Sequence, residues 1–226
     1  MATTSKKAVT KVASVASTRL EPHENTLIEI GIKGISPFLP HGWDEKSLRM
    51  LKMTKPERDK YKHEKRTPED TAKACAYYTD DGSYGVPLVA FKAAIINVAH
   101  TNEGISKVLV RKSLFIPTDD SNMCVPLIHN VEPYVREDTV RVGQGATDLR
   151  YRMCFEDWGA RFKLFVDTSR LTISEVILLA DKAGFSVGIG DWRPERGGEF
   201  GRFQVDTSVP VTQLDPITHE PMKGAA

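Results

Sequence analysis

Alternating apolar and polar residues in two separated segments restrict the folds that this chain can adopt. The first segment, residues 27–33, has isoleucine at every second position, and the second, residues 160–167, alternates in the same way. A period of two is typical of a strand that buries one face against a core. Each segment therefore predicts a β-strand in a half-buried sheet.

Two further segments have the spacing of helices. Residues 87–100 carry apolar residues on one helical face, and residues 173–183 do the same. Thr172 and Glu175 predict a capping box at the start of the second helix, because their side chains can satisfy its first free N–H groups. Gly184 is expected to end that helix, since glycine readily adopts the left-handed conformation found at helix ends.

The remaining strand-like segments complete a repeated pattern. Residues 107–116 are rich in β-branched and apolar residues and predict a strand, and residues 185–190 and 202–206 supply the last strand. Strand, helix and strand thus occur twice in chain order, which is the split βαβ arrangement of a ferredoxin-like domain. We therefore expect an α+β fold with a ferredoxin-like (RRM-like) βαββαβ core, in which both helices cover one face of an antiparallel sheet.

Composition predicts one domain with two insertions and two flanking segments. Residues 1–25 are rich in Ser, Thr, Ala and Lys, which is typical of a disordered arm. The single ferredoxin-like domain is expected to span residues 26–206, with a basic mobile insertion at 46–80 and a β-rich insertion at 117–158. Residues 207–226 contain three prolines and little periodicity, so a C-terminal tail is expected there.

The overall charge and the cysteines limit the possible partners. The net charge is +1, so an argument for a nucleic-acid partner has to come from local patches. The three cysteines form no CxxC pair, which argues against a disulfide framework or a zinc site and favours a reducing compartment. No apolar run has the length of a membrane span, and the N-terminus lacks a signal-peptide core. We expect a cytoplasmic protein that does not enter a membrane.

No catalytic motif is evident in the sequence. The six histidines are scattered, with no HExxH or HxH spacing, and no GxSxG is present. We therefore expect no cofactor and no bound metal. Acid–base cleavage of RNA would need a histidine or lysine at the scissile phosphate, and only His41 and His129 are candidates by position.

Residues 184–205 form a glycine-rich segment that also carries arginines and aromatic residues. A dinucleotide-binding loop needs its glycines between a strand and a helix, whereas a strand is expected to follow here, and the Lys-Ser/Thr of a P-loop is missing. The glycines can instead bring the backbone and the arginines close to the phosphates of a polymer. The residues expected to bind nucleic acid in this segment are Gly188, Gly190, Trp192, Arg193, Arg196, Gly197, Gly198 and Arg202.

Basic residues elsewhere extend this predicted interface. Guanidinium groups bind phosphates in bidentate fashion, and neighbouring aromatic rings can stack on unpaired bases. Residues 46–66 contain nine basic and three acidic residues, a net charge of +6. The additional candidates are Lys52, Lys55, Arg58, Lys60, Lys62, Arg111, Lys112, Arg141, Arg150 and Arg152. The alternative interpretation is a solvated surface, because acidic residues are close to several of these positions in the sequence.

The element order and the segment AGFSVGIGDWRPERGGEFGRFQV, with the preceding helix TISEVILLADK, resemble the RAMP superfamily. More narrowly, the chain is similar to the backbone subunits of CRISPR effector complexes, which coat guide RNA. The stretch VREDTVRVGQGATDLRYRMCFEDWGARFKLFVD is also similar to small proteins of tailed phages with this type of fold. The chain is short for an effector subunit, and we identify no acidic residue that would mark a target-cleaving one.

This resemblance implies a non-catalytic, phage-derived protein that binds single-stranded RNA or DNA. Such a protein would self-assemble along the strand as a homo-oligomer or helical filament, in the host cytoplasm if it is phage-encoded. The basic insertion would then be a thumb-like element. Two alternatives stay open: a phage structural or assembly protein that binds no nucleic acid, and an RNA-processing endonuclease.

Overall fold

The computed structural model of this chain describes residues 24–43, 45–61, 67–102, 104–117, 123–142 and 145–222. Nearly all of the expected N-terminal arm, and the predicted site residue Lys62, lie outside these ranges. The described residues form a mixed α+β structure with antiparallel sheets. Within these ranges, no helix is both long enough and apolar enough to cross a membrane.

The main sheet is built around two long, paired strands, β1 (Asn25–Gly34) and β9 (Trp158–Asp167). β10 (Phe203–Val205) lies on the other side of β1, and β4 (Leu114–Phe115) lies on the other side of β9. The strand order is therefore β10-β1-β9-β4, and every neighbouring pair is antiparallel. Two short strands extend the same sheet: β11 (Thr212–Leu214) pairs with β1, and β6 (Ile128–His129) pairs with β9.

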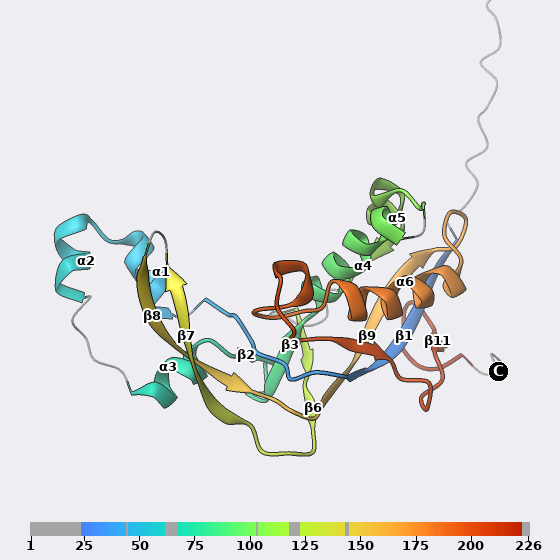
Figure 1. The fold of residues 1–226 in the computed structure, drawn as a ribbon. Helices are drawn as coiled ribbons and strands as arrows, with labels where there is room; N and C mark the ends of the chain where they lie inside the picture. The colour runs from blue at the N-terminus through green and yellow to red at the C-terminus, as the bar shows by residue number, and fades with distance from the viewer. Residues whose placement is uncertain are drawn as a thin grey trace, which may run out of the picture.

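Helices α4 (Leu88–Asn102) and α6 (Ile173–Ser186) cover one face of this sheet (Figure 1). The apolar positions of the central strands face them: Ile30 lies opposite Phe162, and both side chains are buried. Phe91 of α4 stacks on Phe162, with 4.6 Å between the ring centroids. Truncating a buried ring of this kind to alanine costs about 3–5 kcal/mol, so these contacts hold the helices on the sheet.

The β-rich insertion contributes a long hairpin that projects from the main sheet. Among the described residues, its strands β7 (Tyr134–Val142) and β8 (Ala146–Cys154) pair only with each other. The basic insertion forms the short helices α1 (Glu45–Lys52), α2 (Lys55–Tyr61) and α3 (Pro68–Ala74), and α3 packs against β8. The hairpin and these helices lie at one end of the molecule, and the main sheet with α4 and α6 lies at the other (Figure 1).

A small antiparallel sheet lies near the middle of the molecule (Figure 1). Its strands, in spatial order, are β2 (Tyr77–Tyr78), β3 (Tyr84–Pro87) and β5 (Cys124–Pro126). β3 runs directly into α4 at Leu88, so the small sheet positions the start of the helix that covers the main sheet.

The predicted alternating strands and capped helix are confirmed. β1 and β9 occupy the two alternating segments, and α4 occupies the first segment with helical spacing. The capping box is also present, because Thr172 Oγ1 accepts from Glu175 N at 3.2 Å and Glu175 Oε2 accepts from Thr172 N at 2.8 Å. The predicted α+β class and antiparallel sheet are therefore correct.

The strand predicted at residues 107–116 is wrong over most of its length. The segment forms helix α5 (Lys107–Ser113), and only the two residues of β4 join the sheet. Ser106 Oγ accepts a hydrogen bond from Val108 N at 3.2 Å and so caps the start of α5. Arg111 and Lys112 lie in its last turn, where cations interact favourably with the helix dipole. These local interactions favour the helix, whereas the β-propensity of valine depends strongly on context.

Gly184 does not end α6, and residues 185–190 do not form the expected strand. The helix continues to Ser186, with Val187 as its C-terminal cap, and a loop follows. Gly184 is buried against β10, where an added Cβ atom would overlap the backbone oxygen of Phe203. The glycine is therefore explained by the close approach of helix and strand rather than by a helix terminus.

The expected C-terminal tail is partly structured. β11 lies within it, and Leu214 pairs with Leu27 of β1. Both leucines are buried. Within the segment after residue 206, β11 is therefore part of the main sheet.

Candidate functional site

The glycine-rich segment forms a compact loop after α6. The N–H of Ile189 donates to the carbonyl of Gly201 at 3.0 Å, which closes the loop on itself. The N–H of Gly201 donates to Pro37 O at 2.7 Å, and this bond fixes the loop to the segment that follows β1. A single 3-10 turn, η1 (Pro194–Arg196), lies at its tip. The loop is therefore held by its own backbone bonds and by its neighbours.

Two glycines are required by the close approach of backbone within this loop. Gly198 is buried, and an added Cβ atom would overlap the backbone oxygen of Trp192. Gly190 has a φ of 81°, and an added Cβ atom would collide with Leu39 O. A side chain at either position would force the loop to move, since only glycine tolerates such an approach without rearrangement.

A buried ion pair joins the hairpin to the loop. Arg152 of β8 is 6% exposed, and its Nε lies 2.6 Å from Asp191 Oδ2. The Nη2 of the same guanidinium lies 3.2 Å from His41 Nδ1. Arg152 therefore interacts with a loop carboxylate, and a phosphate would have to bind beside this carboxylate or compete with it.

His41 lies beside three of the predicted arginines, because it lines one pocket with Arg150 and Arg152 and a second pocket with Arg193. Burial lowers the pKa of its imidazole below 6.5, and the positive charges of Arg152, Arg150 and Arg193 lower it further, whereas Asp191 acts in the opposite direction. The imidazole is nevertheless 57% exposed. The structure therefore brings together arginines from the hairpin and from the glycine-rich loop around one accessible histidine.

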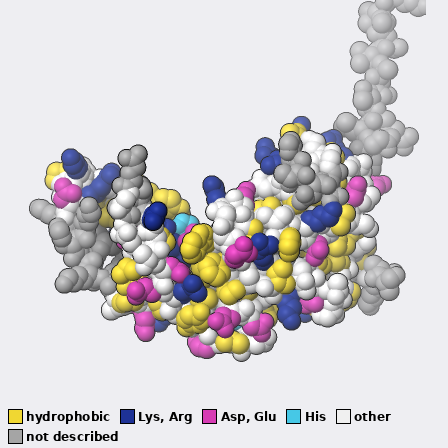
Figure 2. Space-filling model, viewed as in Figure 1, with side chains coloured by type: hydrophobic (Ala, Val, Ile, Leu, Met, Phe, Trp, Pro, Cys, Tyr) yellow, Lys and Arg dark blue, Asp and Glu magenta, His cyan; other side chains and the backbone are white. Residues whose placement is uncertain are grey.

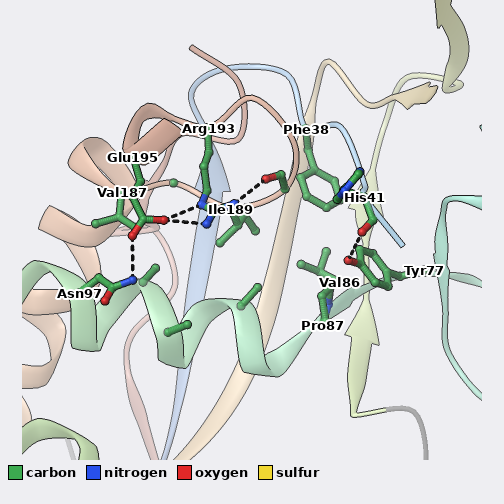
Figure 3. A pocket seen from close by; sticks show the side chains of 15 residues that line it. Phe38, His41, Tyr77, Val86, Pro87, Asn97, Val187, Ile189, Arg193 and Glu195 are labelled. Carbon is green, nitrogen blue, oxygen red and sulfur yellow. Dashed lines mark hydrogen bonds and ion pairs between the residues drawn. The ribbon is translucent and has the colours of Figure 1, made fainter. Parts of the chain in front are cut away.

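Arg193 is held by contacts on two sides. Its Nη2 donates to Glu195 Oε2 at 2.6 Å, and its Nη1 donates to Gly190 O at 3.2 Å. Glu195 Oε1 in turn accepts from Asn97 Nδ2 of α4 at 2.9 Å (Figure 3). This chain of contacts fixes the loop to α4 and orients the Arg193 guanidinium.

The other two loop arginines differ in how firmly they are held. Arg202 Nη1 donates to Phe185 O at 2.9 Å, the guanidinium lies 4.8 Å from the centroid of the Phe185 ring, and Nη2 lies 2.9 Å from Glu199 Oε2. Arg196 is exposed, and within the described ranges its side chain forms no hydrogen bond or ion pair. Arg196 is therefore the loop arginine with the most freedom to contact a ligand.

Aromatic rings lie beside the arginines. Trp192 is 48% exposed and lies 6.1 Å from the ring of Phe200, and Trp43 is 70% exposed. The Arg136 guanidinium of β7 lies 5.0 Å from the centroid of the Phe200 ring, which is a second contact between hairpin and loop. Exposed indole rings can stack on bases, while Phe200 also helps to fix the loop.

The hairpin and the loop border a hollow in the molecular surface (Figure 2). A pocket of about 170 Å³ lies between them. Its lining residues, from both segments and from the chain after β1, are Leu39, Asp138, Val140, Arg150, Arg152, Asp191 and Trp192. Arg150 and Arg152 therefore line the same pocket, as expected for residues two apart on a strand.

We refer to Arg150, Arg152 and Arg193, which lie beside His41, as the arginine cluster. The predicted basic residues outside the glycine-rich loop and β8 do not belong to it. Arg111 and Lys112 are exposed on α5 rather than on a strand, and Arg141 is exposed on β7. Lys52, Lys55 and Arg58 are exposed on the basic helices, Lys60 lies in α2, and Lys62 lies outside the described residues. None of the described residues among them lines the pocket between hairpin and loop.

Two functional candidates were not predicted from the sequence as binding residues: Asp191 and Trp43. Asp191 lies inside the glycine-rich segment, so its place between Gly190 and Trp192 was the available signal.

His129 is the other histidine considered for RNA cleavage. Its ring packs against the rings of Tyr84 and Phe155, and its Nδ1 lies 3.2 Å from Val131 O.

No protein-family model matches this chain, and no curated protein matches it. Among the described residues, no group of three or more His, Cys, Asp and Glu side chains is arranged to hold a metal ion.

Proposed function

We propose that this protein binds single-stranded RNA or DNA in the hollow between the β7–β8 hairpin and the glycine-rich loop. The observation that carries the proposal is that Arg150, Arg152 and Arg193 all lie beside His41: Arg150 and Arg152 line one pocket with it, and Arg193 lines a second pocket with it. Guanidinium groups are the preferred partners of phosphates. Exposed Trp43 and Trp192 supply aromatic faces beside them, as sequence-tolerant binding of single strands requires.

Some of the arginines keep acidic partners, and this affects how a strand would bind. Arg152 pairs with Asp191, and Arg193 pairs with Glu195. A guanidinium has five N–H donors, so Arg193, whose side chain is 29% exposed, can still bind a phosphate oxygen beside Glu195. Arg152, at 7% exposed, adds positive charge below the surface and holds Asp191 and His41. Arg150 and Arg196, for which no carboxylate partner is seen in the described chain, would contribute the most salt-sensitive contacts.

The order of the strands supports the proposal of a ferredoxin-like core. In chain order the main elements are β1, α4, β4, β9, α6 and β10, with α5 added before β4. β1 and β9 are central and β10 and β4 are outer, which is the arrangement expected of a split βαβ repeat. This order and the glycine-rich loop after the second helix support the proposed RAMP-like character. They thereby also support the proposed self-assembly along a single strand of RNA or DNA.

Fluorescence anisotropy with labelled single-stranded RNA and DNA tests the proposal. We expect binding to both at about 50 mM salt and a steep loss of affinity at about 300 mM, because phosphate contacts release counterions. No binding to either strand at the lower salt concentration would contradict the proposal. Light scattering with and without the strand tests assembly, and a filament that forms only with the strand is the expected result.

A structural or assembly protein that binds no nucleic acid is the second candidate. The observations in its favour are the carboxylate partners of Arg152 and Arg193 and the exposed apolar side chains of Trp43, Leu48 and Leu51. Large exposed apolar side chains near one another are typical of contacts between proteins. An oligomer whose size does not change when nucleic acid is added would favour this candidate.

An RNA-processing endonuclease is the third candidate. It is favoured only by His41, whose accessible imidazole lies among arginines that could bind a scissile phosphate. Labelled RNA that stays intact after long incubation with the protein would remove this candidate.

A further inference from the structure

A separate pocket of about 180 Å³ lies between α4 and the glycine-rich loop (Figure 3). Most of its walls are apolar and come from three parts of the chain. They include Phe38 after β1, Val86, Ala90 and Ala94 from β3 and α4, and Val187 and Ile189 from the loop. The small side chains of Ala90 and Ala94 leave the space that the pocket occupies.

The rim of this pocket is polar and adjoins the arginine cluster. His41 and Arg193 line the pocket and also take part in the cluster. Tyr77, Asn97 and Glu195 are the other residues with polar side chains that line the pocket. The Tyr77 hydroxyl donates to His41 O at 2.8 Å, so its oxygen can still accept a hydrogen bond. Apolar walls with a few convergent polar groups are typical of small-ligand sites.

The volume of the pocket limits what can enter it. An apolar cavity of about 150 Å³ takes up one benzene ring, whereas sites for drug-sized ligands measure roughly 300–1,000 Å³. This pocket, at about 180 Å³, therefore has space for one aromatic heterocycle and not for a whole nucleotide.

Hydrogen bonds hold the walls of the pocket in place. The N–H of Asp191 donates to Leu39 O at 2.8 Å, and the N–H of Glu195 donates to Val187 O at 3.2 Å. The Asn97–Glu195 hydrogen bond ties α4 to the loop on the opposite side. These bonds hold the walls apart, so little ordering is required when a ring enters.

We propose that this pocket takes up a single unstacked nucleobase from a strand whose phosphates lie on the arginine cluster. The inference rests on the proposed function, because it uses the same strand and the same cluster. Arg193 lies on the shared border, so a phosphate bound to its free face places the neighbouring base at the mouth of the pocket. The ring would then lie against the apolar walls, with its polar edge at Tyr77 and Glu195.

Ala93 offers a way to block the pocket without disturbing the core. It lines the pocket and is exposed on α4. The change Ala93→Leu fills the mouth with a side chain that favours a helix. Val89→Leu is the matched control, because Val89 is 51% exposed on the same helix and does not line the pocket. Ala93→Met is a second blocking variant with an unbranched side chain, to be used if the leucine variant unfolds.

The experiment compares a single-stranded DNA of roughly 20 nucleotides with a strand of equal length and charge that consists of abasic residues. The unaltered protein should bind the normal strand more tightly than the abasic strand, because bases stack on Trp43 and Trp192 and because one base enters the pocket, which should add about five- to tenfold. Ala93→Leu should lower this preference about five- to tenfold, and Val89→Leu should retain it in full.

Three results would overturn the proposal in distinguishable ways. Equal binding of both strands to the unaltered protein would show that no base is recognised. A preference that is as large in both pocket variants as in the unaltered protein would place base recognition elsewhere, for example on Trp192, and would leave the proposed function standing. Failure of either strand to bind at low salt would overturn the proposed function together with this inference.

Discussion

Arg152 Nε lies 2.6 Å from Asp191 Oδ2, and this ion pair connects strand β8 of the hairpin to the glycine-rich loop. The arginine side chain is 7% exposed and the aspartate side chain is 32% exposed. A charge as deeply buried as that of Arg152 is costly unless it is paired. The relative position of hairpin and loop, and with it the shape of the hollow, therefore depends on this contact.

The change Asp191→Asn should destabilise the protein, because it leaves the Arg152 charge buried without a negative partner. We expect a loss of about 2–3 kcal/mol, less than for a fully buried pair because Asp191 is partly exposed. The measurement is urea unfolding. Asp148→Asn, at an exposed position on the same hairpin, is the control and should stay near the original midpoint. Equal midpoints for both variants would mean that the pair contributes no net stability.

His41 predicts a dependence of stability on pH. Burial and the neighbouring arginines hold its pKa in the folded protein below the unfolded value of about 6.5. Between these two pKa values the unfolded chain binds the proton more readily, so the free energy of unfolding rises with pH in this window. The contribution is present above pH 6.5 and is lost as the pH falls through the folded pKa.

The variant His41→Gln isolates this effect, because it leaves the other histidines in place. Urea unfolding at about pH 5 and about pH 7.5 should show a smaller loss of stability on acidification in the variant than in the unaltered protein. Identical losses in the two proteins would show that His41 does not titrate differently on folding.

Arg196→Ala should weaken binding of a single strand without destabilising the fold. The side chain is exposed, so stability should change by no more than about 0.5 kcal/mol. Loss of one phosphate contact should reduce the slope of log affinity against log salt by about 1. Arg161→Ala removes the same charge from an exposed position of β9, on the sheet face away from the helices, and should leave the slope unchanged. Equal effects of the two variants would indicate a general charge effect.

Arg193→Ala is expected to behave differently from Arg196→Ala. It removes a salt bridge to Glu195 and a hydrogen bond to Gly190 O as well as a phosphate contact. We expect weaker binding together with a loss of stability of about 1 kcal/mol, measured by thermal unfolding. Weaker binding with unchanged stability would show that the Arg193 guanidinium contributes to ligand binding and not to the stability of the fold.

Two adjacent glycines in the loop should tolerate alanine to very different degrees. Gly197 has a φ of 77° and no atom within 4 Å of an added Cβ, so Gly197→Ala should cost only the conformational strain of about 1–2 kcal/mol. In Gly198→Ala the new Cβ would overlap Trp192 O, and the cost should be about 3 kcal/mol or more. Thermal unfolding of both variants measures the difference, and similar midpoints would contradict the described packing of the loop.

The sequence by itself determined the features that depend on local periodicity and local hydrogen bonding. The alternation in β1 and β9 was visible because one face of each strand is buried. The capping box of α6 was visible because its partners, Thr172 and Glu175, are three residues apart. Composition also marked residues 184–205 as a segment of close backbone approach, and in the structure Gly190 and Gly198 lie close to Leu39 O and Trp192 O.

Only the tertiary structure decided which charged residues meet. Arg152, Asp191 and His41 come from three segments that no local pattern connects, and the packing of hairpin, loop and sheet brings them together. Tertiary packing also explains Gly184, which allows α6 to approach β10, where the sequence suggested a helix end. Local rules describe neighbours along the chain, whereas a binding site depends on side chains that become neighbours only when the core has formed.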